Sequence, residues 1–138
     1  MTQTPPQRAQ PGAAPGAAMA ARLSPFWSRH KVEAELGLDA PDLDAAVADG
    51  HVLGLETSDG VVVFPVAQFE RVNDRTRVRP GVRTMLEELK GDDRWSVALI
   101  FTAPAEELSD LSPYEAVIAG TDSARLAAFA HYVHAQWR

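Results

Sequence analysis

Cysteine is absent from the 138-residue chain, which excludes disulfides, thiol nucleophiles and cysteine-ligated zinc sites. Lysine is scarce as well: arginine supplies 11 of the 13 basic residues, against 19 acidic ones. The net charge of −6 argues against a protein that coats nucleic acid without sequence preference. A local basic patch would still be compatible with a DNA contact.

Long apolar runs are missing too, and no stretch approaches the roughly 20 residues of a transmembrane helix. Residues 1–22 form a Pro/Ala/Gly/Gln tract without an acidic residue and without the leucine-rich centre of a secretion signal. Such a tract buries too little apolar surface to offset its ordering entropy, so we expect it to be disordered. Met19 is an alternative start, and we expect a cytoplasmic protein.

The stretch from residue 61 to residue 120 contains the clearest helix boundaries. Val82, Met85, Leu86 and Leu89 are spaced at three to four residues, which predicts an amphipathic helix after Pro80-Gly81 that ends at Gly91. A second helix, residues 95–101, follows Asp92-Asp93 and is apolar almost all round. We therefore expect this second helix, led by Trp95, to be the buried centre of the fold.

Two further helices complete the C-terminal half. Ser112-Pro113-Tyr114-Glu115 has the pattern of a capping box with proline at the first helical position. The last helix, residues 122–138, carries an apolar stripe formed by Leu126, Phe129 or Ala130, Val133 and Trp137.

Residues 24–64 predict two short helices followed by a β-hairpin. Ser28 can cap the first helix, which Gly37 closes, and Pro41 opens the second. The apolar runs 51–55 and 61–64 flank Asp59-Gly60, a strong hairpin sequence. This is the layout of a winged helix–turn–helix.

Charge argues against the usual use of that layout. The second helix offers only acids, Asp42, Asp44 and Asp49, where a recognition helix offers groups that bind bases or phosphate. We therefore favour a structural lobe over a DNA reader. The possible nucleic-acid contacts are Arg29, His30, Lys31, Arg71, Arg75, Arg77 and Arg79.

The charges are also unevenly distributed along the C-terminal half. Five arginines lie between residues 71 and 83, opposed only by Asp74, whereas residues 103–124 contain five acids and no base. The arginine stretch could bind phosphate or an acidic protein surface, but a solvated loop and helix face is the favoured interpretation. Separate basic and acidic zones suit self-association or a charged partner.

No catalytic pattern is present: there is no glycine-rich phosphate loop, no HExxH and no GxSxG. His131 and His134 lie three residues apart, but no third ligand of suitable spacing accompanies them. We therefore expect a protein that acts by binding, without enzymatic activity, metal or cofactor.

The order of several short motifs resembles a known family. Those motifs are Phe64-Pro65-x-x-Gln68-Phe69, Arg79-Pro80-Gly81-Val82, Trp95-x-x-Ala98, Leu108-x-x-Leu111-Ser112-Pro113-x-Glu115-Ala116 and Gly120. Together they resemble the toxin-binding domain of the Xre/MbcA/ParS-type antitoxins, partners of RES-domain toxins. Residues 61–138 carry the resemblance, and residues 28–60 resemble the variable head that precedes this domain. The chain departs from the family in its acidic head and in Ser109-Asp110, where glycine-containing pairs are common.

The resemblance implies a type II antitoxin that binds a NAD-consuming RES-domain toxin and covers its active site with the C-terminal part. It also implies a homodimer or larger hetero-complex. The toxin-binding residues expected on this basis are Leu111, Ser112, Pro113, Tyr114, His131, His134, Gln136, Trp137 and Arg138. The competing functions are a DNA-binding transcriptional regulator and an adaptor that has lost its toxin.

The predicted fold is mainly α, with a winged helix–turn–helix-like head that has one β-hairpin, followed by a small C-terminal helical bundle. The expected divisions are a disordered tail at 1–22, the head at 23–64 and the toxin-binding domain at 65–138.

Overall fold

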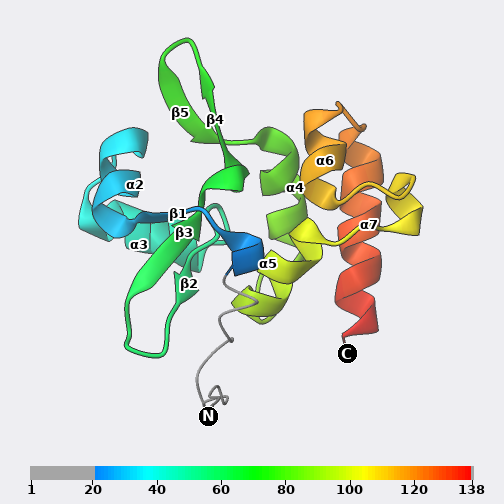
Figure 1. Cartoon of the computed structure of the whole chain (residues 1–138), viewed down its shortest axis with the longest axis horizontal. Coiled ribbons are helices and arrows are strands. Elements are labelled where there is room, and N and C mark those ends of the chain that lie inside the picture. Colours follow the sequence, from blue (N-terminus) through cyan, green and yellow to red (C-terminus); the bar gives the residue numbers. More distant parts are fainter. Residues whose placement is uncertain (1–20, 138) are drawn as a thin grey trace, which may run out of the picture.

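The structure, a computed structural model, describes residues 21–137. These residues form mostly helices, with two small antiparallel sheets (Figure 1). Most of the tail predicted to be disordered, including Met19, lies outside the described residues, as does Arg138. Residues 21–23 are helical and Leu23 is buried, so an ordered chain begins before the predicted boundary.

The two helices predicted in the head are present. In α2 (Arg29–Leu36), the Ser28 side chain accepts a first-turn amide N–H, and the helix ends at Gly37, whose φ of 69° is left-handed. In α3 (Ala40–Ala48), the Asp39 carboxylate accepts a first-turn N–H in the same way. Both helices therefore begin where a side chain satisfies amides that lack an intrahelical partner.

The first sheet joins β1 (Phe26–Ser28), β2 (Leu55–Glu56) and β3 (Val62–Pro65) in the order β1-β3-β2. The predicted hairpin between β2 and β3 is confirmed, with Leu55 opposite Val63. Its first strand is shorter than predicted, because residues 51–54 form a buried loop rather than a strand. β1 was not predicted.

The second sheet corrects the prediction for the arginine-rich stretch. After the predicted short helical turn, η1 (Val66–Gln68), residues 69–78 form a hairpin of β4 (Phe69–Val72) and β5 (Arg75–Val78), not a loop. Asn73 and Asp74 form its turn with φ values of 54° and 64°. Two consecutive positive φ values are the requirement of a tight hairpin turn, which asparagine and aspartate tolerate. The hairpin tip extends from the body of the molecule (Figure 1), while Arg71 and Thr76 bond Glu35 of α2.

The C-terminal half contains α4 (Pro80–Glu88), α5 (Arg94–Thr102), η2 (Glu106–Leu108), α6 (Pro113–Ile118) and α7 (Ser123–Gln136). The predicted starts hold to within two residues, whereas α4 ends at Glu88, before the predicted Gly91, and α7 ends at Gln136 rather than at residue 138. Gly91 follows α4 with a φ of 92°, and Asp93 caps α5. The capping box of α6 is complete, with Ser112 and Glu115 each bonding the other's backbone N–H.

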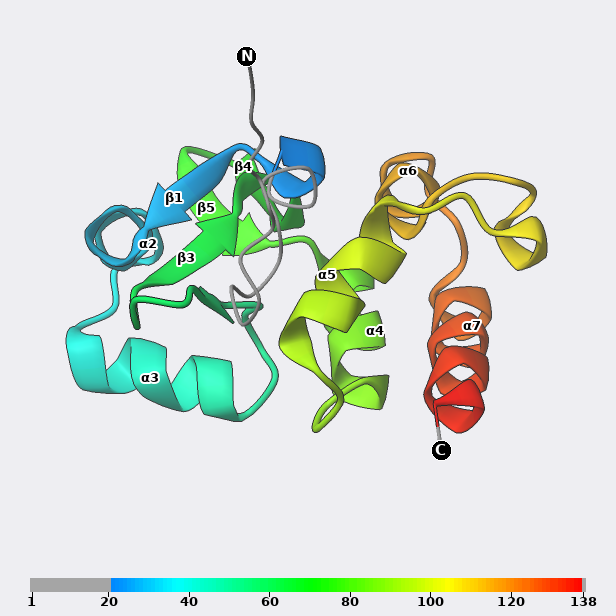
Figure 2. The same ribbon diagram turned by 60° about the horizontal axis from the view of Figure 1, so that its bottom comes forward.

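The centre of the fold is α4, not α5 as predicted. Val82, Met85, Leu86 and Leu89 have no exposed surface, and α4 lies between the strands and α7 (Figures 1 and 2). This helix joins the head to the C-terminal helices, because its core cluster also includes Leu53 and Leu55 of the head.

α5 is buried on one face only. Val97, Ala98 and Phe101 are buried, whereas Leu99, Ile100 and Trp95 remain partly exposed. The Trp95 indole Nε1 donates to the Glu56 carbonyl at 2.9 Å, which ties the start of α5 to β2. The expectation of an all-round buried helix was wrong because apolar composition does not determine how many neighbours a helix has.

Candidate interaction surface

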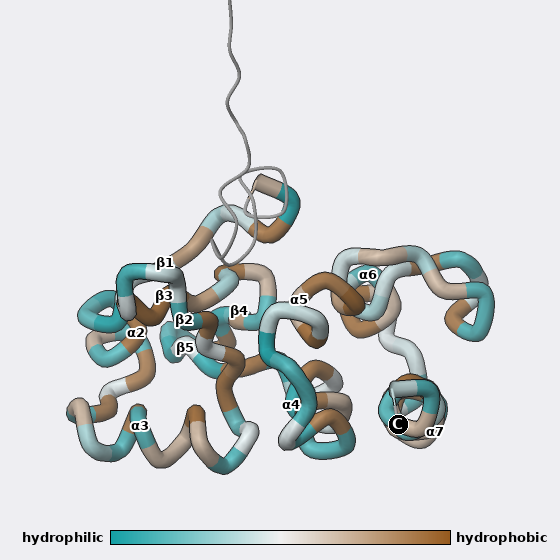
Figure 3. The backbone as a smooth tube through the Cα atoms, turned by 90° about the horizontal axis from the view of Figure 1, so that it is seen from below, coloured by the Kyte–Doolittle hydropathy of each residue, from teal (hydrophilic) through white to brown (hydrophobic). Residues whose placement is uncertain are grey.

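The last helix, α7, packs on α4 along the predicted stripe except at Trp137, which follows the helix as its C-cap and is 40% exposed. Leu126, Phe129, Ala130 and Val133 are buried. Seen nearly end-on, α7 stands at the edge of the molecule with polar and apolar sides (Figure 3). The side away from the stripe is therefore open to a partner.

The two histidines predicted to bind the toxin face α4 instead. His134 Nδ1 lies 2.7 Å from Asp92 Oδ2, and His131 Nδ1 lies 3.5 Å from Glu88 Oε1. The His134–Asp92 pair is the more protected, with side chains 33% and 14% exposed. This pair thus links α7 to the turn between α4 and α5, whereas His131 remains largely accessible.

The predicted contact at the start of α6 is mostly interior. Ser112 and Pro113 are buried, and Leu111 is half-buried. The Tyr114 ring packs against Phe101 with centroids 5.2 Å apart. Burial raises the pKa of the Tyr114 phenol, whose oxygen has no hydrogen-bond partner among the described residues. Ser112 and Pro113 therefore offer little surface to a partner, whereas Leu111 and Tyr114 are partly exposed, and their binding of a toxin stays a prediction.

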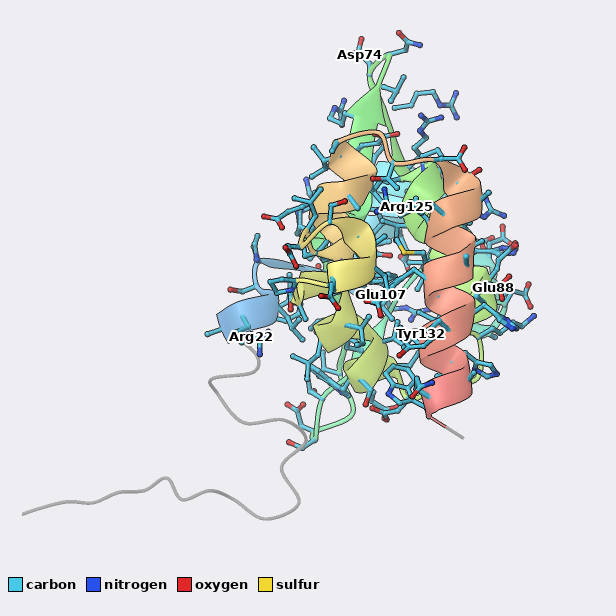
Figure 4. The ribbon with its side chains drawn as sticks, turned by 90° about the vertical axis from the view of Figure 1, so that its right-hand side faces the viewer. Arg22, Asp74, Glu88, Glu107, Arg125 and Tyr132 are labelled. Atoms are coloured by element: carbon cyan, nitrogen blue, oxygen red, sulfur yellow. The ribbon has the colours of Figure 1, made fainter. Side chains whose placement is uncertain are left out.

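Two members of the predicted set remain exposed at the end of α7: Gln136, and Trp137 at 40%. Tyr132, which was not predicted, is 49% exposed on the same helix (Figure 4). Its position beside the predicted apolar stripe, rather than on it, would have identified it from helical spacing alone.

We define the α7 outer surface as the exposed residues that surround Tyr132. They are Ala124, Ala128, Tyr132, Ala135 and Gln136. These five residues are uncharged, and the alanines leave the helix backbone open to close approach. The exposed Arg125, two turns before Tyr132 on the same side of α7, is the charged residue of this side. Its guanidinium donates to the Glu107 carbonyl at 3.0 Å and to Ser109 Oγ at 3.1 Å, which fixes the loop that contains η2.

That loop contains Ser109-Asp110, the pair at which the sequence departs from the antitoxin family that it resembles. Both residues have positive φ, 60° and 67°. Glycine adopts this conformation without steric cost, whereas serine and aspartate adopt it at some cost. The loop therefore keeps a conformation that suits glycine although the sequence has none there.

The candidate nucleic-acid contacts on the hairpin are largely neutralised. Arg71 pairs with Glu35 at 3.0 Å, and Glu70 binds both Arg77 at 2.7 Å and Arg79 at 3.5 Å. The Thr76 hydroxyl and the neighbouring Lys31 and Arg71 hold the pKa of the Glu35 carboxyl below its usual range. Within the described residues, Arg75 is the one hairpin arginine without an ion pair or side-chain hydrogen bond.

The three candidate nucleic-acid contacts at the start of α2 also lie beside carboxylates. Arg29 pairs with Glu33 at 3.2 Å and with Asp44 of α3, and Lys31 pairs with Glu35 at 2.9 Å. His30 is almost fully exposed, and its Nδ1 lies 3.7 Å from Glu33 Oε1. A phosphate would have to compete with carboxylates at nearly every one of the predicted sites.

In residues 21–137, no group of three or more histidine, aspartate or glutamate side chains could hold a metal ion. Among the helices of this same range, none combines the length and apolar character needed to cross a membrane.

Comparisons with known proteins match nothing: neither a protein-family model, nor a curated protein, nor a solved structure matches the chain.

Proposed function

We propose that the protein is a non-enzymatic, cytoplasmic antitoxin that binds a RES-domain, NAD-consuming toxin and blocks its active site. The observation that carries the proposal is the exposed outer surface of α7, with Tyr132 at its middle and Trp137 at its end. Aromatic side chains dominate interface energies, and an exposed aromatic on a terminal helix is available to a partner.

The motif residues that resemble the antitoxin family support this proposal through their structural roles. Gln68 ties the 51–54 loop to η1, Gly81 allows α4 to approach its neighbours closely, and Ser112 caps α6. Of these three roles, that of Gly81 bears directly on α7, because the missing side chain lets α4 approach Leu126. The other two stabilise the head and the start of α6.

The head supports a winged helix–turn–helix in its connectivity. Strand, two helices and hairpin follow one another, and the third strand lies between the other two. In the proposed architecture α3 would be the recognition helix and the β2–β3 loop the wing, with α4–α7 as the helical bundle. Both DNA-facing elements are acidic: α3 contains Asp42 and Asp44, and the β2–β3 hairpin contains Asp59.

That connectivity is the reason to keep a DNA-binding regulator as the second candidate. If the protein binds its own promoter, through the head or the β4–β5 hairpin, the affinity should fall steeply between about 50 and 200 mM salt, since phosphate contacts release counterions. We expect no such specific binding in a gel-shift titration, because the cations are paired with carboxylates. Specific, salt-sensitive binding that Arg75→Ala weakens would favour the regulator.

Replacing Tyr132 tests the antitoxin proposal. Tyr132→Glu places a charge at the centre of the α7 outer surface and should weaken toxin binding about 30-fold or more, corresponding to about 2 kcal/mol. The measurement is NAD depletion by the toxin encoded next to this gene, with increasing amounts of each variant. Growth of cells that express the toxin gives the same comparison in vivo.

Val61→Glu is the matched control, because Val61 is also an exposed apolar residue, at 53%, but lies in the β2–β3 loop. It should protect as well as the unmodified protein. A folded Tyr132→Glu variant that still protects fully would refute the proposed contact. If no gene for a toxin lies beside this gene and the protein binds no NAD-consuming enzyme, the adaptor function would be favoured instead.

A further inference from the structure

A groove with an apolar floor lies where the head meets the start of α4. Its volume is about 410 Å³, which falls within the range of small-ligand sites. The floor is built from α2, α3, β5, the first turn of α4 and the loops between them. Its residues are Leu36, Leu38, Ala46, Val52, Val78 and Pro80.

This floor is the uncovered side of the head's core. Four floor residues pack against the core cluster that contains Val32, Leu43 and Phe64, yet they remain partly exposed: Leu36, Leu38, Ala46 and Val78. An apolar group placed in the groove would remove the apolar surface of both partners from water, which is favourable in proportion to the area buried.

The charges at the rim of the groove are positive. His51, Arg77 and Arg83 line it, and no carboxylate of the described residues does. Arg77 is paired with Glu70 at 2.7 Å. Within residues 21–137, neither Arg83, which is exposed, nor His51, which is half-buried, forms an ion pair. The rim therefore has two basic side chains available to a ligand.

An apolar floor beside unpaired basic side chains matches a ligand with an apolar body and one negative charge. A neutral apolar molecule would gain nothing from the charge of Arg83. A free phosphate would place a strongly hydrated group beside apolar side chains and leave the floor uncovered. A carboxylate, by contrast, accepts two parallel hydrogen bonds from a guanidinium, and its apolar body can cover the floor.

We infer that this groove binds a small apolar monocarboxylate of the medium-chain fatty acid type. The hydrocarbon body lies on the floor, and the carboxylate accepts hydrogen bonds from Arg83, with His51 at the same rim. Because the head and α4 both contribute to the floor, the ligand bridges the two parts of the fold. The α7 outer surface takes no part, so this inference stands or falls separately from the antitoxin proposal.

Isothermal titration calorimetry of the full chain, with octanoate as the probe, tests the inference. Octanoate should bind at one site with a Kd on the order of 100 μM. Acetate, which lacks the apolar body, and octanol, which lacks the charge, should both bind at least about tenfold more weakly. From butanoate to octanoate, each added methylene group should lower the Kd about two- to fourfold, because it covers more of the floor.

Arg83→Gln separates the rim from the floor. It should raise the Kd for octanoate about five- to tenfold, because the carboxylate loses its charged partner. The gain per methylene group should stay the same, because the floor is unchanged. Arg75→Gln is the matched control, since Arg75 is an exposed arginine of β5 that does not line the groove, and it should bind octanoate like the unmodified protein. Circular dichroism melting verifies that both variants are folded, which is expected because both replaced side chains are exposed.

Two-dimensional proton–nitrogen NMR spectra locate the site. Octanoate should shift the amide signals of Leu38, Val52 and Val78, and leave those of α7 unchanged. Absence of binding at about 5 mM octanoate, far above the expected Kd, would overturn the inference.

Three other results would overturn it as well. The first is octanol binding as tightly as octanoate, and the second is equal affinity of Arg83→Gln and Arg75→Gln for octanoate. The third is an acidic peptide with a single leucine that shifts the same amide signals and binds more tightly than octanoate, because the groove would then serve a protein partner.

Discussion

Gly81→Val should destabilise the protein by about 3 kcal/mol and detach α7 from α4, because overpacking a close helix contact displaces its neighbours. A Cβ atom at Gly81 would lie 2.9 Å from Leu126 Cδ1 and 2.9 Å from Val117 Cγ2. Leu126 is 1% exposed and sits in the core, so it has little free space to enter. Urea unfolding followed by circular dichroism measures the loss.

Gly81→Ala gives a graded comparison. In an unobstructed helix, replacing glycine by alanine gains up to about 1 kcal/mol through backbone entropy. Here we expect alanine to lose stability despite that gain, and valine to lose more. Ala34→Val is the control, because Ala34 is exposed on α2 and has room for the added methyl groups. If the Gly81→Val protein is as stable as this control, then α6 and α7 can move away from α4 with little loss in the free energy of unfolding.

The same substitution links stability to the proposed function. If α7 no longer packs on α4, its outer surface loses a fixed position, and protection against the toxin should fall even though Tyr132 is unchanged. Gly81→Val thus tests whether toxin binding needs α7 packed on α4, whereas Tyr132→Glu tests the contact between α7 and the toxin.

Features encoded by neighbouring residues could be predicted from the sequence. Ser28, Gly37 and the Ser112–Glu115 capping box mark helix ends in the structure as predicted. Each works through hydrogen bonds or φ values within one turn, so the sequence alone contains the required information. The β2–β3 hairpin followed from Asp59-Gly60 for the same reason.

The β4–β5 hairpin was not predicted, although its turn is also formed by neighbouring residues. Its turn is Asn73-Asp74 rather than a pair with glycine, and its arginines suggested a solvated loop. The alternation of buried Thr76 with exposed Arg75 and Arg77 was present in the sequence. A polar strand face that carries charged residues weakens the apolar alternation on which strand prediction depends.

Long-range contacts could not be predicted. His134 meets Asp92 across 42 residues of sequence, and Tyr114 is buried against Phe101 of another helix. Nothing in the local spacing of either residue indicates its neighbour. The predicted toxin-binding set therefore combined side chains that hold the scaffold together with the few that remain available on α7.

Gln68→Leu should cost about 3 kcal/mol or more, because it removes the side-chain partner of three backbone groups at about 1–3 kcal/mol each. Gln68 has no exposed surface. Its Oε1 accepts the Leu53 N–H at 2.9 Å, and its Nε2 donates to the Leu53 carbonyl at 2.8 Å and to the Pro65 carbonyl at 3.1 Å. The Gln68 side chain thus makes, with the backbone of Leu53 in the 51–54 loop, the hydrogen bonds that a neighbouring β-strand would otherwise make.

Leucine has a similar size and keeps the packing, so the loss reports the hydrogen bonds rather than a cavity. Gln136→Leu, the same change at an exposed position of α7, should leave the free energy of unfolding nearly unchanged. Urea unfolding at pH 7 compares the two variants. If Gln68→Leu is as stable as Gln136→Leu, another group or water must satisfy Leu53, and the bridging role would be refuted.

Gln68→Glu tests the hydrogen bonds that the side chain donates separately from the one that it accepts. Its carboxylate can still accept the Leu53 N–H but places negative charge against two carbonyl oxygens in a buried position, which raises its pKa above that of an exposed glutamate. Because the folded-state pKa is the higher one, the variant is least stable at neutral pH and regains stability as the pH falls through that pKa. A protonated carboxyl donates one hydrogen bond, so recovery should be partial. Urea unfolding of Gln68→Glu between pH 7 and pH 5, relative to Gln136→Glu, should reveal this recovery, and equal pH dependence in both variants would place Gln68 outside the buried hydrogen-bond network.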